Sequence, residues 1–116
     1  MDDKTLEMTM LYDFFGDLLT EKQRTYFDLY YNDDLSLSEI SQQTGISRQG
    51  VRDNIMRAEQ LLRGYEEKTG IVARFMKLQS DISSIEKDVS AIIEASDGGV
   101  KRTAEAVRDK LQELKG

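Results

Sequence analysis

Apolar residues recur at helical spacing along the whole chain, and alternation of apolar and polar residues never lasts more than a few positions. The pattern predicts a first helix over about residues 4–19 with a wide apolar stripe. A second helix runs to about residue 31, because residues 20–23 read Thr-Glu-Lys-Gln, which is a capping box. The predicted core positions of these two helices are Met10, Leu11, Phe14, Phe15, Leu18 and Leu19, followed by Tyr26, Phe27, Tyr30 and Tyr31.

Two further helices follow a turn-forming Asn-Asp-Asp run at residues 32–34. Ser36 and Glu39 form a second capping box, and the helix that they open ends near Thr44. Gly45 can adopt the left-handed backbone that a tight helix exit requires. Ser47 is the predicted N-cap of the next helix, whose inward positions are Val51, Ile55, Ala58, Leu62 and Tyr65.

The C-terminal part carries heptad spacing. One apolar seam has alternating steps of four and three residues, and a second seam repeats the same steps after a turn at residues 96–99. We expect a helix break at Thr69–Gly70 and an αα-hairpin that folds seam to seam, although one or both seams could instead dock on the first helix. The first seam is Ile71, Phe75, Leu78, Ile82, Ile85, Val89 and Ile92; the second is Val100, Ala104, Val107, Leu111 and Leu114.

The predicted fold class is therefore all-α, with a four-helix domain over residues 1–68 and a two-helix arm over residues 69–116. The first seam of the arm is longer and heavier than the second, and exposed apolar side chains are unfavourable in water. We expect a homodimer that pairs through the arm. The competing explanation is that the first helix covers the excess within the same chain.

The amino-acid composition excludes several kinds of metal site and catalytic mechanism. The 116 residues include no Cys, His, Trp or Pro. This excludes disulfides, thiolate or imidazole zinc sites and histidine acid–base catalysis. The acidic pairs are better explained as solvated segment ends than as a calcium cage. We expect neither a metal ion nor a cofactor, and no enzymatic activity.

The net charge of -6 argues against non-specific nucleic-acid binding, which depends on phosphate neutralisation. Any such activity needs a local basic patch. The N-terminus has neither a basic start nor an apolar run, and no stretch approaches the ~20 apolar residues that span a bilayer. We expect a cytoplasmic protein that does not insert into a membrane.

Residues 36–62 fit a helix-turn-helix. This motif needs a small residue where its helices touch, a glycine in the turn, an apolar plug after it and an apolar anchor in the second helix. Ser41, Gly45, Ile46 and Val51 stand at those offsets. The predicted second helix, residues 47–63, carries four arginines against two acids, so the motif has the basic patch that the whole chain lacks.

The inward positions of that helix leave Arg48, Gln49 and Arg52 facing outward near its start, the end that enters the major groove in such motifs. Arginine can bond guanine and glutamine can bond adenine, each with two hydrogen bonds. The hydroxyls of Ser36 and Ser47 suit phosphate contacts at helix N-termini. Arg57 is either a further backbone contact or an internal ion-pair partner. The predicted nucleic-acid-binding residues are Ser36, Ser47, Arg48, Gln49, Arg52 and Arg57.

Residues 19–63 resemble the fourth, promoter-reading region of bacterial sigma factors: Leu-Thr-x-x-x-Arg, Ser-x-x-Glu-Ile, Gly-Ile-Ser-x-x-x-Val-Arg and Arg-Ala stand in that order. With the Met-Leu-Tyr-Asp-Phe-Phe-Gly stretch of residues 10–16 and Leu-Leu-Thr-Glu-Lys-Gln of residues 18–23, the chain also resembles the small YlxM-type family. Genes of that family stand beside those of the signal recognition particle GTPases in Gram-positive bacteria. The resemblance implies a regulatory or accessory role in that pathway, with signal recognition particle components as partners.

Two departures from the sigma-factor pattern affect what the motif would bind. Asp53 lies on the predicted reading face, and Asp33 and Asp34 precede the first helix of the motif, where they repel phosphate. These departures favour a selective, weak or RNA-directed binder, or a helix-turn-helix used against protein, while DNA stays favoured over RNA as the ligand. The alternative is a protein-interaction adaptor in the same pathway that uses the helix-turn-helix without reading a sequence.

Overall fold

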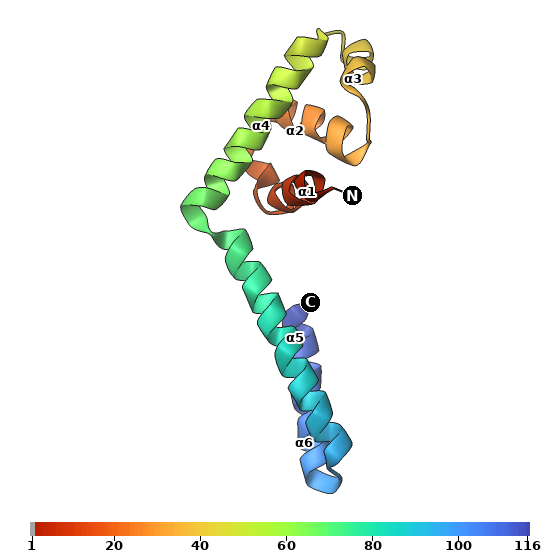
Figure 1. Ribbon diagram of the computed structural model, residues 1–116, viewed down its shortest axis with the longest axis vertical. Helices are drawn as coiled ribbons and strands as arrows, with labels where there is room; N and C mark the ends of the chain where they lie inside the picture. The colour runs from red at the N-terminus through yellow and green to blue at the C-terminus, as the bar shows by residue number, and fades with distance from the viewer. Residues whose placement is uncertain (1) are drawn as a thin grey trace. The chain divides into compact units, whose positions relative to one another are not determined.

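The computed structural model describes residues 2–116, which form helices and short connections without a strand (Figure 1). This confirms the predicted all-α class. The chain divides into an N-terminal unit that ends at Val72 and a C-terminal unit, Ala73–Gly116. None of the helices in residues 2–116 is long and apolar enough to cross a membrane. The elements are α1 (Asp3–Phe15), η1 (Gly16–Leu18), α2 (Glu21–Phe27), η2 (Asp28–Asn32), α3 (Leu37–Thr44), α4 (Arg48–Thr69), α5 (Ile71–Ala95) and α6 (Gly98–Lys115).

Helix α1 is shorter than predicted. It begins after Asp2, whose carboxylate accepts a hydrogen bond from the Thr5 backbone N–H at 2.7 Å, and it ends where η1 makes a 3₁₀ turn. The tighter turn changes the angle between successive side chains, so Leu19 returns to the core while Leu18 is 61% exposed. Leu18 and the 38% exposed Phe14 were therefore wrongly predicted as core residues. The buried face of α1 is Met8, Leu11 and Phe15.

The predicted capping box at the start of α2 is confirmed. The Thr20 hydroxyl accepts from the Gln23 backbone N–H at 3.1 Å, and the Gln23 side chain accepts from the Thr20 N–H at 2.9 Å. The helical path continues through the π-helical segment η2. Phe27 is fully buried, and its ring lies 4.5 Å from the rings of both Tyr12 and Tyr31. Of the aromatic residues predicted as core, Tyr30 stays 37% exposed.

Helix α4 contacts the other helices of the N-terminal unit. Its predicted inward residues Val51, Ile55, Ala58 and Leu62 are buried. Ala58 and Leu62 pack with the buried face of α1 and with Phe27, whereas Val51 and Ile55 pack with Tyr26 and Ile40. The second of these clusters fixes the angle at which α3 meets α4. The predicted break is confirmed, since α4 ends at Thr69 and Gly70 has a φ of 63°.

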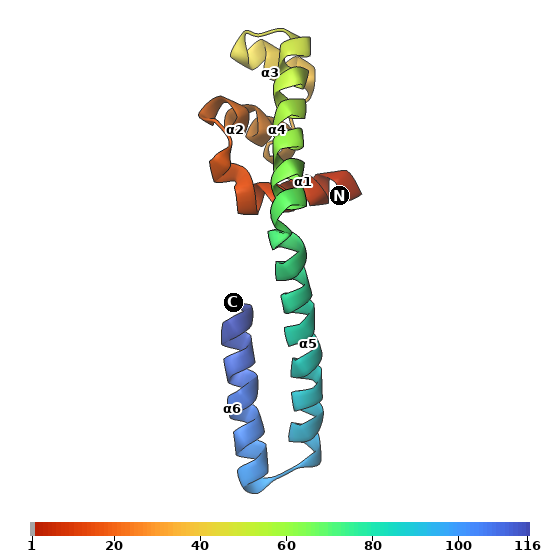
Figure 2. The same cartoon turned by 90° about the vertical axis from the view of Figure 1, so that its left-hand side faces the viewer.

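The C-terminal unit is the predicted αα-hairpin, with α5 and α6 running side by side (Figure 2). The prediction that the two seams pack against each other is correct for only part of the seam residues. Alternate seam residues form a buried row: Ile82, Val89, Ala104 and Leu111. The intervening residues stay exposed, because the two helices meet along a line rotated away from the seam. On that line the Gln79 amide donates to the Lys115 carbonyl at 3.3 Å, and the Lys115 ammonium lies 3.3 Å from the Glu86 carboxylate.

Candidate nucleic-acid interface

A short turn joins α3 to the start of α4 (Figure 1). Side-chain to backbone hydrogen bonds hold this segment. Ser36 and Glu39 form the predicted capping box of α3, with both hydrogen bonds at 3.1 Å. Gly45 has a left-handed φ of 81°. The Ser41 hydroxyl donates to the Ile46 carbonyl at 2.5 Å, which joins the end of α3 to the residue before the Ser47 cap. The local geometry predicted for a helix-turn-helix is present.

Gly45 gives a direct test of this turn. A Cβ at this position meets nothing within 4 Å, so Gly45→Ala is penalised by its left-handed backbone rather than by a clash. We expect Gly45→Ala to destabilise the protein by about 1 kcal/mol, and Gly45→Asn by less, because asparagine tolerates this conformation better. The control is Gly64→Ala inside α4, where a Cβ also meets open space. It should stabilise by roughly 0.5–1 kcal/mol in urea unfolding; equal effects of both alanines would contradict the assignment.

All six residues predicted to bind nucleic acid are exposed. Arg48 and Arg52 stand one turn apart at the start of α4, and Arg57 follows further along the helix. Within residues 2–116, none of these three guanidinium groups has an acidic partner within 4 Å. Arg57 is thus not the internal ion-pair partner that the sequence left open. Arg48 and Arg52 lie on one side of the first part of α4, whereas Arg57, nine residues after Arg48, lies on about the opposite side of the helix.

Ser47 caps α4 by accepting a hydrogen bond from the Gly50 backbone N–H at 3.0 Å. A hydroxyl that accepts in this way keeps its own hydrogen, which can be donated to a phosphate oxygen. The Gln49 amide donates to the Asp53 carboxylate at 3.0 Å. Asp53 therefore occupies one hydrogen-bonding group of Gln49, and this contact has to open before Gln49 can bond a base edge with its whole amide.

Ser36 lies in a different electrostatic setting. The shallow depression that it lines also contains the carboxylates of Asp2, Asp34 and Glu39. Asp34 adopts a left-handed φ of 57° and forms the turn into α3. Because three acids repel a phosphate from this helix start, Ser36 is a weaker anion contact than Ser47.

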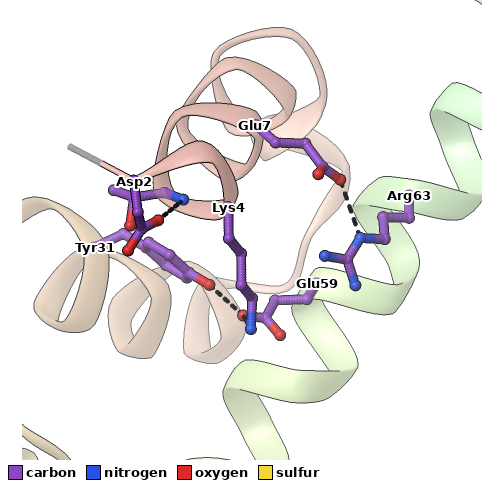
Figure 3. Close-up of polar contacts among 7 residues, drawn as sticks. Asp2, Lys4, Glu7, Tyr31, Glu59 and Arg63 are labelled. Carbon is purple, nitrogen blue, oxygen red and sulfur yellow. Dashed lines mark hydrogen bonds and ion pairs between the residues drawn. The ribbon is translucent and has the colours of Figure 1, made fainter.

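Glu59, one of the two acids counted in residues 47–63, is buried, with only 6% of its surface exposed. The Tyr31 hydroxyl donates to its carboxylate, and the Lys4 ammonium lies 3.4 Å away (Figure 3). One turn further along α4, the Arg63 guanidinium donates to Glu7 at 3.0 Å. These contacts join α1 and η2 to α4. They pair one acid and one base of residues 47–63, Glu59 and Arg63, with residues of α1, so the charge balance of this segment stays as its sequence indicates.

Lys4 is a basic residue near the interface that sequence reasoning missed. It lines a shallow pocket together with Arg52 and Arg63, beside the buried Glu59. No local pattern marks Lys4, because only the packing of α1 on α4 brings it near Arg52. In the described part of the chain, no group of three or more Asp or Glu side chains is placed to hold a metal ion.

The environment of Tyr31 predicts that the stability of the folded protein decreases at alkaline pH. Burial, and then the hydrogen bond to Glu59, raise the pKa of Tyr31 above its ordinary value of 10. A raised pKa stabilises the folded state below pH ~10, and this contribution is lost at higher pH because the unfolded chain releases the proton first. In Tyr31→Phe we expect lower stability at pH 7, by about 1.5–3 kcal/mol, and a smaller further loss at pH 11.

The matched control for this test is Tyr30→Phe, which removes a neighbouring hydroxyl that does not bond Glu59. Urea unfolding of the natural sequence and of both variants at pH 7 and pH 11 gives the comparison. Equal losses on alkalinisation in the natural sequence and in Tyr31→Phe would show that the Tyr31 hydroxyl does not couple folding to pH.

The capped turn, its glycine and the apolar contacts between α3 and α4 define a helix-turn-helix protein. Comparison of sequences shows the family. The profile of the UPF0122 family, described as "Putative helix-turn-helix protein, YlxM / p13 like", matches residues 2–98, and the chain belongs to this family. This confirms the resemblance to the YlxM-type family.

Individual relatives agree with this assignment. A UPF0122 protein of Thermoanaerobacter sp. (strain X514) is 44% identical over 115 residues, which cover 98% of each chain. A UPF0122 protein of Halalkalibacterium halodurans is 49% identical over 89 residues, covering 77% of this chain and 82% of the relative. One from Bacillus cereus (strain AH187) is 46% identical over 90 residues, covering 78% and 82%.

Proposed function

We propose that this protein is a cytoplasmic, non-catalytic regulatory protein that binds nucleic acid, with α4 as its recognition helix. The observation that carries the proposal is the exposed pair Arg48 and Arg52, without acidic partners in the described chain, at the start of the second helix of a helix-turn-helix. In such motifs the start of the second helix enters the major groove of DNA. DNA is accordingly the favoured ligand over RNA.

Each residue has a distinct role in this proposal. Arg48 and Arg52 contact base edges, and Gln49 joins them once it leaves Asp53. Ser47 and Arg57 contact phosphates. Lys4 pairs with Glu59 at 3.4 Å and so offsets that acid beside Arg52. Ser36 remains in the proposed site but, beside three acids, contributes least.

The biological setting of the proposal is an accessory role in the signal recognition particle pathway, with components of that particle as partners. Its support is membership of the YlxM-like family, together with the resemblance of residues 19–63 to the fourth region of sigma factors. A homodimer would suit this role, because paired helix-turn-helix units read two half-sites on one duplex.

A second function is favoured by the acids of the motif. Asp53 bonds Gln49 on the reading face, and Asp33 and Asp34 are exposed before α3. These features fit a protein-interaction adaptor in the same pathway, which would use the helix-turn-helix surface without reading a sequence.

Salt dependence separates the two functions. Ligands are first recovered from cells with the tagged full chain, and binding to each recovered ligand is then measured by fluorescence anisotropy at 50–300 mM salt. For DNA, the logarithm of affinity should fall with the logarithm of salt concentration by about 0.9 per phosphate neutralised, so the three arginines of the site predict a slope of roughly -1 to -3 for one copy of the chain. A recovered protein ligand whose affinity hardly changes with salt, without any recovered nucleic acid, would establish the adaptor instead.

A further inference from the structure

The C-terminal hairpin buries little apolar surface for its length. Its core is the row Ile82, Val89, Ala104 and Leu111, with Ile93 packed against it. Chains below roughly 40 residues usually need disulfides, metals or association to fold stably, and the unit Ala73–Gly116 is close to that length. The chain has no cysteine, and the described residues hold no cluster of metal ligands. Association with a second copy would bury further apolar surface of this hairpin.

A second apolar row, which we call the outer row, is exposed on the same hairpin. On α5 it consists of Leu78, Ile85 and Ile92, and on α6 of Val100, Val107 and Leu114, each seven residues from the next; all are 39–71% exposed. Ile92, Val100 and Val107 line one apolar groove, so both helices present this row on one side of the hairpin.

We propose that the outer row is the interface by which two copies of this chain pair into a four-helix bundle. Steps of seven residues on both helices are the spacing with which helices interdigitate in such bundles. This proposal does not depend on the proposed function, because it concerns the association of the chain with itself.

The area of the row suits a dimer. Its six residues expose on the order of 500 Å² of apolar surface, which is near the upper limit for a patch on a whole monomeric protein. Pairing two copies would bury about twice that area. Since apolar atoms form roughly 60% of a typical interface, the total with its polar rim approaches the ~1,600 Å² of a stable complex.

The charges beside the row favour one arrangement. Asp81 and Asp88 each follow an outer-row residue of α5 by three positions and precede the next by four, so they flank the row on α5. Asp81 also pairs with Lys77 of the same helix at 2.8 Å, so Asp88 is the acid of this flank without an ion pair in the described chain. Lys110 has the same place between Val107 and Leu114 on α6. A two-fold axis parallel to the helices places α5 of each copy against α6 of the other and brings acid to base. Pairing α5 with α5 would bring the acids together.

Sedimentation velocity and thermal melting of the full chain, from about 1 to 100 µM, test the proposal. We expect a dimer by tens of micromolar and a melting temperature that rises with concentration, as association requires. A monomer at 100 µM with a concentration-independent melting temperature would overturn it, and this outcome does not depend on any variant.

Variants locate the interface. Ile85→Glu places a charge in the outer row and should raise the dimer Kd at least 100-fold. Ser84→Glu adds the same charge at the adjacent exposed position, outside the row, and should change the Kd less than threefold. Equal effects would overturn the assigned interface.

Lys110→Glu tests the arrangement of the helices. This surface change leaves the hairpin core intact and should weaken the dimer several-fold; an unchanged Kd would overturn the arrangement of α5 against α6 of the other copy.

Discussion

Replacing both Arg48 and Arg52 by alanine should abolish nucleic-acid binding without unfolding the protein. Both side chains are exposed at the start of α4 and have no acidic partner in residues 2–116. Their loss therefore removes no ion pair from the described part of the N-terminal unit. A bidentate contact from arginine to guanine contributes about 1–3 kcal/mol, so two such contacts predict at least a ~30-fold loss of affinity.

The control for this variant removes the same charge elsewhere. Lys87→Ala with Arg102→Ala takes two exposed cations from the C-terminal unit and leaves the helix-turn-helix unchanged. Both double variants are compared by anisotropy on a duplex selected from a random pool by the natural sequence, with circular dichroism to check helicity. Equal affinities for the two double variants would mean that α4 is not the recognition helix.

Phe27→Ala should cause the largest loss of stability of any substitution considered for this chain. Phe27 is fully buried between the rings of Tyr12 and Tyr31, in the cluster that joins α1 to α4. Truncating such a residue typically costs about 3–5 kcal/mol, from lost burial and from the cavity left behind. Because small domains are stable by only about 5–15 kcal/mol, we expect a melting temperature at least ~10 °C lower.

Phe14→Ala is the matched control, since it removes the same ring from a position that is 38% exposed. We expect this variant to melt within a few degrees of the natural sequence. Differential scanning calorimetry of both variants gives the comparison. If the two substitutions lowered the melting temperature equally, the core described around Phe27 would be incorrect.

Local signals explain why the order of helices could be predicted. The capping boxes at Thr20 and Ser36, the left-handed Gly45 and the break at Gly70 each depend on residues within a few positions of one another. Such hydrogen bonds join residues that are close in sequence, so the pattern alone predicted the turn of the helix-turn-helix. The exposed arginines of α4 followed from its periodicity in the same way.

Contacts between distant segments could not be predicted. Nothing near Glu59 in the sequence indicates that it is buried. In the fold, Tyr31 of η2 donates a hydrogen bond to its carboxylate and Lys4 of α1 forms an ion pair with it. Lys4 likewise lies near Arg52 through the packing of α1 on α4.

The sequence by itself determined the all-α class, the helix-turn-helix and the heptad spacing of the arm, because capping and periodicity act within one helix or one turn. The tertiary structure decided which of the heptad residues are buried. A pair of helices can cover only one side of each partner, so Ile82 and Val89 enter the core of the hairpin whereas Ile85 and Ile92 remain exposed. That choice depends on how α5 and α6 rotate against each other, which the spacing of seven residues does not specify.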